Sequence, residues 1–363
     1  MFTILHTESS MGWGGQENRI LQESIGLKKR GVRVIILCQP YSIISERASA
    51  DGIEIRTHRL KKAYDIFAIK RILSLIKVEK IDIVNTHSGK DSFLAGIAGR
   101  ISKQKPLIVR TRHLALPITS RFTYSYLPHV IVTVSEYVRQ YLIKENISPQ
   151  KIVAIPTGID TNKFDPWKTN SNLREEVGIA KDILLAGTIS ILRRKKGHHL
   201  LLDAIPLVLR KIPEALFLIV GDGPQKGNIS NKVRDMGLSE KVILLGMRED
   251  IPNILKSIDI FVLPTLQEAL GTSFLEAMAM EKPVIGFNID GVKEVIKHGL
   301  NGYLVESGNP VLLADAIVDL FKNREKVRTM GYKGREMILK DFTADKMCER
   351  AYSLYLTSLK EKR

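Results

Sequence analysis

The sequence predicts an α/β protein in which two doubly wound parallel sheets each carry helices on both faces. Short apolar runs alternate with helical patterns along nearly the whole chain, and continuously apolar strands are typical of parallel sheets covered on both sides. A length of 363 residues exceeds one typical hydrophobic core and favours two domains. The turn-rich stretch Pro156-Thr157-Gly158-Ile159-Asp160 interrupts the alternation near the middle, and we expect the hinge there.

The expected elements follow this alternation in order. Residues 2–6 are strand-like, residues 16–30 have a helical pattern that ends at Gly31, and residues 32–37 are strand-like again, which makes a β-α-β unit. Further strands are expected at 81–86, 107–110, 130–134 and 152–155, and then at 183–187, 216–221, 242–245, 260–263 and 284–287. We predict domains of residues 1–157 and 158–342, with a C-terminal helix of about residues 343–363 that packs back on the first domain.

The composition, 44% hydrophobic and 26% charged, is that of a soluble globular protein. No run of 18 apolar residues is present, so no transmembrane helix is expected, and the start MFTILHTESS lacks the features of a signal peptide. Cys38 and Cys348 lie far apart and have neither metal-ligand nor redox spacing, which indicates a reducing compartment. We therefore expect a cytoplasmic protein.

The charge is strongly positive and unevenly distributed. The net charge is +16; residues 1–160 hold 24 basic and 13 acidic residues (24 − 13 = +11), and residues 161–363 hold 31 and 26 (31 − 26 = +5). A basic N-terminal half favours a polyanionic partner, which could be a nucleic acid, a phosphorylated substrate or an anionic membrane surface. A nucleic-acid-binding protein remains an alternative class, although the sequence has no zinc finger, helix-turn-helix cue or RNP-like aromatic motif.

Ligands of doubly wound sheets bind beyond the carboxyl ends of the strands, so the loops after the strands are the places to search. Gly14 and Gly15 follow the first strand and directly precede a helix, where close backbone approach and free N–H groups suit a phosphate. The dinucleotide pattern G-x-G-x-x-G is not met, because Glu17 occupies the position of the last glycine. A nicotinamide enzyme is therefore disfavoured.

Two features of the second half point to an anion and a polyhydroxylated ligand. Four consecutive cations, Arg193-Arg194-Lys195-Lys196, stand between a buried strand and a helix, a position that favours an anion site over a solvated charge run. Glu268 and Glu276 are separated by seven residues, and a helix begins between them with Thr272 or Ser273 near its N-cap. The carboxylates can accept hydrogen bonds from sugar hydroxyls, while the free N–H groups of the helix can bind a phosphate.

Taken together, the motifs resemble the retaining glycosyltransferases of family 4, which have the GT-B fold of two Rossmann-like domains facing a cleft. The matching segments span most of the chain in the order of the family: Gly14-Gly15-Gln16-Glu17, Val134-Ser135-Glu136, Ile155-Pro156-Thr157-Gly158-Ile159-Asp160, Leu192-Arg193-Arg194-Lys195-Lys196-Gly197, Gly221-Asp222-Gly223-Pro224, Leu245-Gly246-Met247-Arg248-Glu249-Asp250, Glu268 with Glu276, and Asn301-Gly302-Tyr303-Leu304-Val305. One segment alone is weak evidence, whereas eight in order are specific.

The resemblance implies a role for each matching residue. Glu276 would hold the ribose hydroxyls of a nucleotide sugar, Glu268 would contact the transferred sugar, and Arg193 and Lys196 would neutralise the diphosphate. Gly14 and Gly15 would approach the diphosphate, and His113 would lie near the donor sugar. The base would be contacted by Gly246, Met247 and Arg248, and the start of the donor-binding helix would be formed by Gly271, Thr272 and Ser273. Many relatives have G-R-L-x-P-x-K-G, and here Ile191 stands at the arginine position; the variant L-R-x-x-K-G fits and favours Arg193 over Arg194.

The implied reaction is the transfer of a sugar from a nucleoside-diphosphate sugar, with UDP favoured over GDP, to a glycan or lipid-linked acceptor. Fixed cations and helix N-termini can stabilise the negative charge that grows on the leaving diphosphate. The chain has no D-x-D metal motif in a suitable loop, so no metal and no other cofactor are expected. The family suggests bacterial cell-surface polysaccharide synthesis, such as lipopolysaccharide or capsule; a sugar-nucleotide 2-epimerase of the same fold remains an alternative.

Two segments of the basic N-terminal half are candidates for contact with the anionic inner face of the cytoplasmic membrane. The first is an amphipathic helical pattern with apolar Ile66, Phe67, Ile69, Leu73 and Ile76, whose apolar face we expect to pack on the sheet, and with basic Arg56, Arg59, Lys61, Lys62, Lys70 and Arg71 around it. The second is the loop of residues 113–128, with Leu114, Leu116, Phe122, Tyr124 and Tyr126 beside Arg112 and Arg121.

Overall fold

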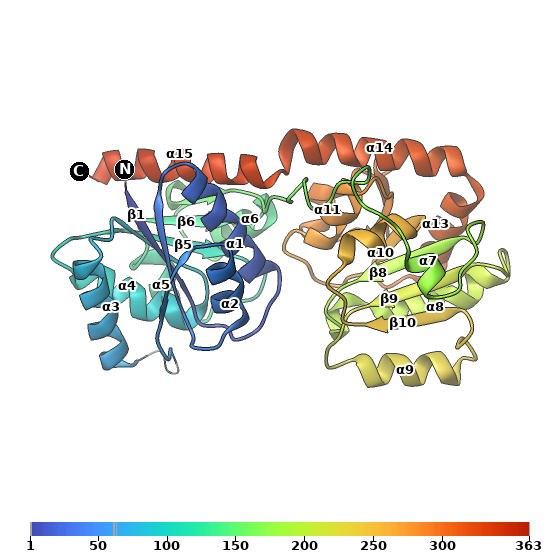
Figure 1. Ribbon diagram of the computed structural model, residues 1–363, viewed down its shortest axis with the longest axis horizontal. Coiled ribbons are helices and arrows are strands. Elements are labelled where there is room, and N and C mark those ends of the chain that lie inside the picture. The colour runs from blue at the N-terminus through green and yellow to red at the C-terminus, as the bar shows by residue number, and fades with distance from the viewer. Residues whose placement is uncertain (1, 61, 63, 363) are drawn as a thin grey trace. The chain divides into compact units, whose positions relative to one another are not determined.

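The computed structural model describes residues 2–60, 62 and 64–362, and the chain in it divides into two compact units. Unit 1 consists of Met1–Gly158 with Ala344–Arg363, and unit 2 of Ile159–Thr343. The domain limits expected from the sequence were 157/158 and 342/343. Each unit is a parallel sheet with helices on both faces (Figure 1), so the predicted doubly wound α/β class is confirmed.

Unit 1 contains a parallel sheet with the strand order β3-β2-β1-β4-β5-β6-β7 in its described residues. The strands are β1 (Thr3–Glu8), β2 (Arg33–Cys38), β3 (Glu54–Thr57), β4 (Ile83–Thr86), β5 (Leu107–Arg112), β6 (Val130–Thr133) and β7 (Ile152–Ala154). The helices are α1 (Gly15–Lys29), α2 (Ile43–Ala50), α3 (Ile66–Val78), α4 (Gly89–Ile101), α5 (Phe122–Ser125), α6 (Glu136–Lys144) and α15 (Ala344–Lys362).

Successive residues of the central strands of unit 1 point into two different hydrophobic layers. Ile4 of β1 packs in the layer that contains α1 and α15, and its neighbour Leu5 packs in the layer that contains α3 and α4. Both are fully buried, which accounts for the continuously apolar strands in the sequence. The short edge strand β3 was not predicted, because its residues Glu54 and Arg56 are polar and only half-buried.

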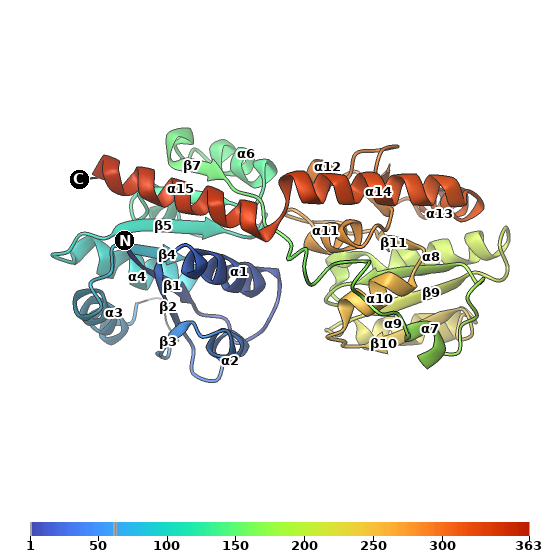
Figure 2. The ribbon, with the colours of Figure 1, turned by 45° about the horizontal axis from the view of Figure 1, so that its top comes forward.

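The C-terminal helix α15 packs along α1 and the sheet of unit 1, as both ribbon views show (Figure 2). Its buried side chains include Cys348 and Tyr355. A Cβ on Gly26 of α1 would lie 2.1 Å from Cys348 Sγ, so a glycine is required where the two helices meet. The Tyr355 hydroxyl accepts a hydrogen bond from Asn85 Nδ2 at 2.9 Å and donates one to Glu23 at 2.5 Å, which ties the end of the chain to the sheet.

Unit 2 contains a parallel sheet with the strand order β10-β9-β8-β11-β12-β13. The strands are β8 (Leu185–Ile189), β9 (Leu216–Val220), β10 (Val242–Gly246), β11 (Ile260–Leu263), β12 (Val284–Phe287) and β13 (Gly302–Val305). The helices are α7 (Leu173–Glu176), α8 (His198–Leu209), α9 (Lys226–Asp235), α10 (Ile251–Ser257), α11 (Thr272–Ala279), α12 (Val292–Val295), α13 (Pro310–Lys322) and α14 (Arg324–Asp341), with a 3-10 turn over Arg194–Lys196. The edge strand β13 was not predicted.

Each sheet has one point at which the strand order changes direction. In unit 1 this point lies between β1 and β4, and in unit 2 it lies between β8 and β11. At such a point the loops leave the two strands toward opposite sides and open a crevice, which is where doubly wound sheets bind their ligands. The loops after β1, β4, β8 and β11 are therefore the first places to look for a site.

Candidate functional site

The loops after β8 and β11 are joined directly at the switch point of unit 2. The Lys195 carbonyl accepts hydrogen bonds from the Leu266 N–H at 2.7 Å and from Thr265 Oγ1 at 3.1 Å. Gly197 has φ 72°, and a Cβ there would lie 1.8 Å from the carbonyl oxygen of Pro264. Only glycine permits this approach, so the sequence fixes the cationic loop against the loop that carries Glu268.

Lys196 and Glu268 form an ion pair across these two loops. Each side chain is only 17% exposed, so water screens the pair weakly. The backbone of Glu268 is held as well, because its carbonyl accepts from the Gly291 N–H at 3.2 Å and its N–H donates to Asp290 at 3.4 Å. The predicted residues Lys196 and Glu268 are thus brought together, which places a fixed cation and a fixed carboxylate at the carboxyl ends of β8 and β11.

Helix α11 begins beside this pair with Gly271 as its N-cap residue. The helix begins where the sequence predicted, with Thr272 and Ser273 next to the N-cap: Gly271 has φ 91° and leads directly into Thr272 as the first helical residue. The Phe274 N–H bonds to the Gly271 carbonyl at 3.0 Å, whereas the N–H groups of Thr272 and Ser273 have no acceptor in the described part of the chain. Two free donors and the positive end of the helix dipole therefore lie at the switch point.

Glu276 lies about one turn further along α11 and is half-buried. Its carboxylate has no hydrogen-bond or ion-pair partner among the residues that the structure describes. Burial raises the pKa of Glu276 to about 7, while the charge of Lys163 acts to lower it. An unpaired, largely desolvated carboxylate reduces stability, so its presence beside free N–H donors indicates a ligand with hydroxyl or amide donors of its own.

Arg193 and Arg194 are exposed and belong to the same loop as Lys196, whose N–H donates to the Arg193 carbonyl at 2.9 Å. Both line a small pocket of about 90 Å³ against α8 and α9, together with Gln225 and Asn228. The pocket therefore does not separate Arg193 from Arg194 as candidates for an anion. The glycine-rich turn after β9 packs against this loop, because the Leu192 N–H donates to the Asp222 carbonyl at 2.9 Å.

Of the residues expected to contact a base, the Arg248 side chain is engaged elsewhere. Its guanidinium donates to Asp250 at 2.7 and 2.8 Å and also bonds Glu176, and these carboxylates raise the pKa of Arg248. The hydrogen bonds from Arg248, with a further one from Asn253, lower the pKa of Asp250 to about 2. Met247 is 75% exposed, so its side chain is accessible to a ligand, while the Gly246 carbonyl accepts from the Gly221 N–H at 2.8 Å.

In unit 1 the loop after β1 contains Gly14, the N-cap residue of α1, and Gly15, its first residue. Gly14 has an extended φ of −165° and Gly15 has no positive φ, so backbone conformation does not require glycine at either position. The buried Glu8 at the end of β1 accepts from the Ser10 N–H at 2.8 Å and from Gln16 Nε2 at 2.5 Å. Burial and the nearby Asp91 raise the pKa of Glu8 to about 8.

His113 follows β5 directly and is only 8% exposed. Its Nε2 lies 3.0 Å from Nδ1 of His87, which follows β4, and His87 Nε2 lies 2.9 Å from Nδ1 of His6 in β1. The sequence argument singled out His113 and missed the other two rings. All three histidines stand at or near the carboxyl ends of strands, but only the sheet order shows that these strands are neighbours.

The two surfaces expected to contact a membrane are partly as predicted. In α3 the residues Ile72 and Ile76 pack on the sheet, but Ile66 and Phe67 are 65% and 81% exposed, so the expectation that they pack on the sheet is wrong. In the loop of residues 113–128, Tyr124 is fully buried under the guanidinium of Arg110 and cannot contact a partner. Leu114, Leu116, Phe122 and Tyr126 are exposed.

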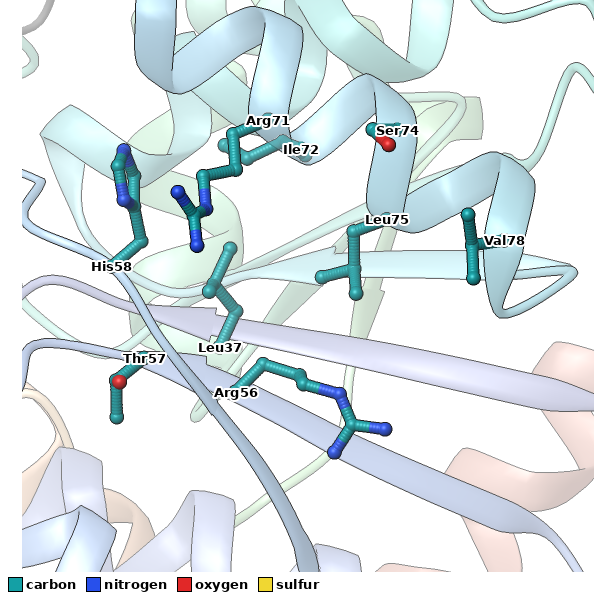
Figure 3. Close-up of a pocket in the computed structure, with 9 residues that line it drawn as sticks. All are labelled: Leu37, Arg56, Thr57, His58, Arg71, Ile72, Ser74, Leu75 and Val78. Carbon is teal, nitrogen blue, oxygen red and sulfur yellow. The ribbon is translucent and has the colours of Figure 1, made fainter.

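A pocket of about 460 Å³ lies between the end of β3 and α3. Figure 3 shows the Arg71 guanidinium and the His58 ring on one side of it, with Arg56 on the other. Arg56 is paired with Glu79 at 2.7 Å, which leaves Arg71 as the available cation. Lys61, part of the expected basic cluster, lies outside the described residues. No helix in the described ranges has both the length and the apolar character needed to cross a bilayer.

Comparison with known proteins defines the class to which this fold and site belong. The model of glycosyl transferases group 1 matches residues 169–337, and the model of glycosyltransferase family 4 matches residues 13–163. The chain is 31% identical over 309 residues to UDP-Gal:alpha-D-GlcNAc-diphosphoundecaprenol alpha-1,3-galactosyltransferase of Escherichia coli, which covers 80% of this chain and 79% of that protein. It is 25% identical over 340 residues to the capsular polysaccharide biosynthesis glycosyltransferase CapM of Staphylococcus aureus, covering 86% and 90%.

The solved structures agree on the fold. A glycosyltransferase from Rickettsia africae matches with a TM-score of 0.88 and 24% identity over 98% of this chain and 97% of that chain. Anabaena HepE in complex with UDP and glucose matches with a TM-score of 0.87 and 20% identity over 99% and 100%. The protein is a GT-B glycosyltransferase. The chain belongs to glycosyltransferase family 4, as its motifs indicated.

Proposed function

We propose that this protein transfers a sugar from a UDP-sugar, with retention of the anomeric configuration, to a lipid-linked acceptor in the synthesis of a bacterial cell-surface polysaccharide. The E. coli and S. aureus relatives support this assignment, because their names specify a UDP-sugar donor with a diphosphoundecaprenol-linked acceptor, and capsular polysaccharide synthesis. The observation that carries the proposal is the unpaired Glu276 carboxylate close to free helix N–H groups and the Lys196–Glu268 pair.

These groups divide the recognition of a nucleotide sugar among them. We assign the diphosphate to Lys196, with Arg193 or Arg194, and to the N–H groups of Thr272 and Ser273, because each offers a positive charge or a free donor. Glu276 would accept hydrogen bonds from the two ribose hydroxyls, and Glu268 from hydroxyls of the sugar. The leaving UDP gains negative charge as the glycosidic bond breaks, and the fixed cations stabilise that charge.

We propose that no metal is required, since side-chain cations and the α11 N-terminus can supply the positive charge. Transfer should then keep its full rate in excess EDTA, and a loss of rate that Mg²⁺ restores would contradict this part of the proposal. The assignments of Gly14, Gly15 and His113 to the donor remain predictions. Gly14 and Gly15 suit close approach of a ligand, because no backbone strain explains a glycine at either position.

The exposed apolar and basic side chains of unit 1 suit contact with an anionic membrane that contains the acceptor. Ile66 and Phe67 protrude at the start of α3, with Lys62, Lys70 and Arg71 exposed around them. Apolar side chains in a basic surrounding are typical of helices that lie in the headgroup region. Binding to liposomes that contain anionic lipid, with affinity falling as salt rises, is the expected behaviour.

The donor assignment is tested by thermal shift with a panel of nucleoside diphosphates and sugar nucleotides. A ligand that binds only the native state raises the melting temperature by mass action. We expect UDP and UDP-sugars to stabilise the wild type more than GDP does, and we expect Glu276→Ala and Lys196→Ala to abolish the selective shift. A shift that persists in both variants would place the nucleotide elsewhere.

A further inference from the structure

The small pocket beside the loop of residues 193–196 lies on the face of the unit 2 sheet opposite to α11. Ile260 and Val262 of β11 pack in the hydrophobic layer that contains α8 and α9. Phe261, the residue between them, packs edge-on against Phe274 of α11, with 5.6 Å between the ring centroids. Successive side chains of a strand point to opposite faces of a sheet, so α8 and α9 cover one face and α11 covers the other. The pocket, which α8 and α9 border, is therefore separate from the start of α11.

Two helices begin at this pocket, and both leave N–H donors unused in their first turns. In α8, which has 12 residues, the N–H groups of His198 and His199 have no acceptor among the described residues. In α9, which has 10 residues, the same is true of the N–H groups of Gly227 and Asn228. Free N–H groups and the positive ends of two helix dipoles together favour an anion at this place.

Three cationic side chains border the same pocket, and none of the described residues that line it is acidic. The guanidinium groups of Arg193 and Arg194 have no partner in the part of the chain that the structure describes. Lys232 is held at the pocket by Asp203, 2.6 Å from its Nζ, and by the His199 carbonyl at 3.1 Å. Cations gathered without a counter-charge repel one another, and a bound anion removes that repulsion.

A buried histidine provides a further donor at the pocket. His198 is only 2% exposed and borders the pocket. Its Nε2 lies 3.0 Å from Oγ of Ser190, which is outside the pocket, while its buried Nδ1 has no hydrogen-bond partner. Burial and the nearby charge of Lys196 lower the pKa of His198 to about 4, so the ring is neutral. When the Ser190 hydroxyl donates to Nε2, the ring proton stands on Nδ1 and requires an acceptor that the protein does not supply.

The volume of the pocket, about 90 Å³, limits the size of its ligand. Pockets that enclose a whole small molecule are typically about 300–1,000 Å³, so this one has room for a single tetrahedral group. Backbone N–H groups at helix N-termini and arginine side chains are the donors that proteins use for phosphate oxygens. The size and the donors therefore agree on one kind of ligand.

We propose that this pocket is a second anion site of unit 2, which binds one phosphate group, either of inorganic phosphate or of a phosphate monoester. The site goes beyond the proposed sugar transfer and does not depend on it. Neither Glu268, Glu276 nor the start of α11 borders the pocket.

The test is calorimetric titration of the full chain with inorganic phosphate, and separately with glucose 1-phosphate, at constant ionic strength in chloride. Asn228→Asp places a carboxylate where the phosphate is expected, and an aspartate in the first turn of α9 favours the helix, so the variant should fold. We expect it to weaken phosphate binding by about tenfold or more. Asn231→Asp adds the same charge on the same helix, outside the pocket, and is the matched control with a change below about twofold.

A second variant removes a cation instead of adding a carboxylate. Lys232→Gln should weaken phosphate binding about three- to tenfold, since one charge-assisted hydrogen bond is lost. With the wild type saturated with UDP, phosphate should still bind with an affinity within about threefold of that in its absence, because the two sites are separate.

The outcomes separate this site from the donor site. No phosphate binding by the wild type, or equal phosphate affinity in Asn228→Asp and Asn231→Asp, would overturn the proposal. Loss of phosphate binding in the presence of saturating UDP would also overturn it, because the phosphate would then occupy the donor site. Tighter binding of glucose 1-phosphate than of phosphate would identify a monoester as the ligand, and the reverse order would identify the free anion. Failure of the wild type to bind UDP would contradict the proposed function, while the phosphate titrations would still decide this site.

Discussion

Replacement of Glu276 by glutamine should stabilise the protein above neutral pH while it weakens nucleotide binding. The carboxylate is half-buried without a partner, and its pKa rises from 4.5 to about 7 in the folded chain. A rise of about 2.5 units corresponds to about 3 kcal/mol of lost stability when the group is ionised. Glutamine has nearly the same shape and carries no charge, so Glu276→Gln should recover most of that free energy.

The sign of the pH dependence follows from the same shift. Between pH 4.5 and about 7 the folded chain holds the Glu276 proton that the unfolded chain has released. The stability that this bound proton contributes is therefore fully present at low pH and is lost as pH rises through that range. Above it, the group no longer makes the free energy of unfolding depend on pH. The variant should match the wild type near pH 4.5 and melt about 6–12 °C higher at pH 8, taking 2–4 °C per kcal/mol for a domain of this size.

The assay is thermal unfolding of both proteins from pH 4.5 to 8, followed by UDP titration. The ionised carboxylate offers both of its oxygens as acceptors to the two ribose hydroxyls, whereas the protonated carboxyl keeps only its carbonyl oxygen as a good acceptor. Wild-type UDP affinity should therefore fall by up to about tenfold per pH unit below pH 7, whereas the variant should bind UDP weakly at all pH values. Glu240→Gln, at an exposed glutamate of the same unit, is the control. Equal melting temperatures of wild type and Glu276→Gln at pH 8, or unchanged UDP affinity in the variant, would refute the reasoning.

Four further outcomes are expected. Glu268→Gln removes the charge that neutralises Lys196, so it should bind UDP about three- to tenfold tighter by calorimetry yet transfer sugar at least tenfold more slowly; weaker UDP binding would count against the pair. Gly197→Ala should lower the free energy of unfolding in urea by about 2–4 kcal/mol, because it forces a side chain into φ 72° and against a carbonyl oxygen, and a neutral effect would disprove that contact. Tyr355→Phe leaves two buried polar partners without its hydroxyl and should cost about 2–4 kcal/mol in the same assay, whereas no loss would show that α15 is held by other contacts. Phe67→Ser should reduce co-sedimentation with anionic liposomes about tenfold at low salt, and equal binding would dismiss this surface; Val311→Ser, at an exposed apolar residue of unit 2, is the control.

The fold was predictable because short segments of the sequence carry the patterns that mark its strands and its domain boundary. Continuously apolar strands such as β11 lie between two covered faces, and the turn-rich stretch around Gly158 falls where the two units meet in sequence. The strands that escaped prediction are both at sheet edges. Half-buried edge residues such as Glu54 and Arg56 carry little hydrophobic signal, so no periodicity marks them.

The site was predictable where a motif places residues on adjoining loops, and less so where partners come from distant elements. Lys196 and Glu268 meet because the loops after β8 and β11 share the switch point. The Arg248 side chain is held by Glu176, 72 residues earlier in the chain, and no local pattern reveals that contact. The histidine chain needs three strands whose adjacency is a property of the sheet order, which the sequence does not display.

The central claim is that the switch point of unit 2 binds the nucleoside diphosphate of the donor, and a crystal structure with UDP tests it most directly. The account predicts the diphosphate within hydrogen-bond distance of Lys196 Nζ and of the Thr272 and Ser273 N–H groups, with the ribose hydroxyls on the Glu276 carboxylate. UDP bound away from α11, with Glu276 still unpartnered, would contradict it.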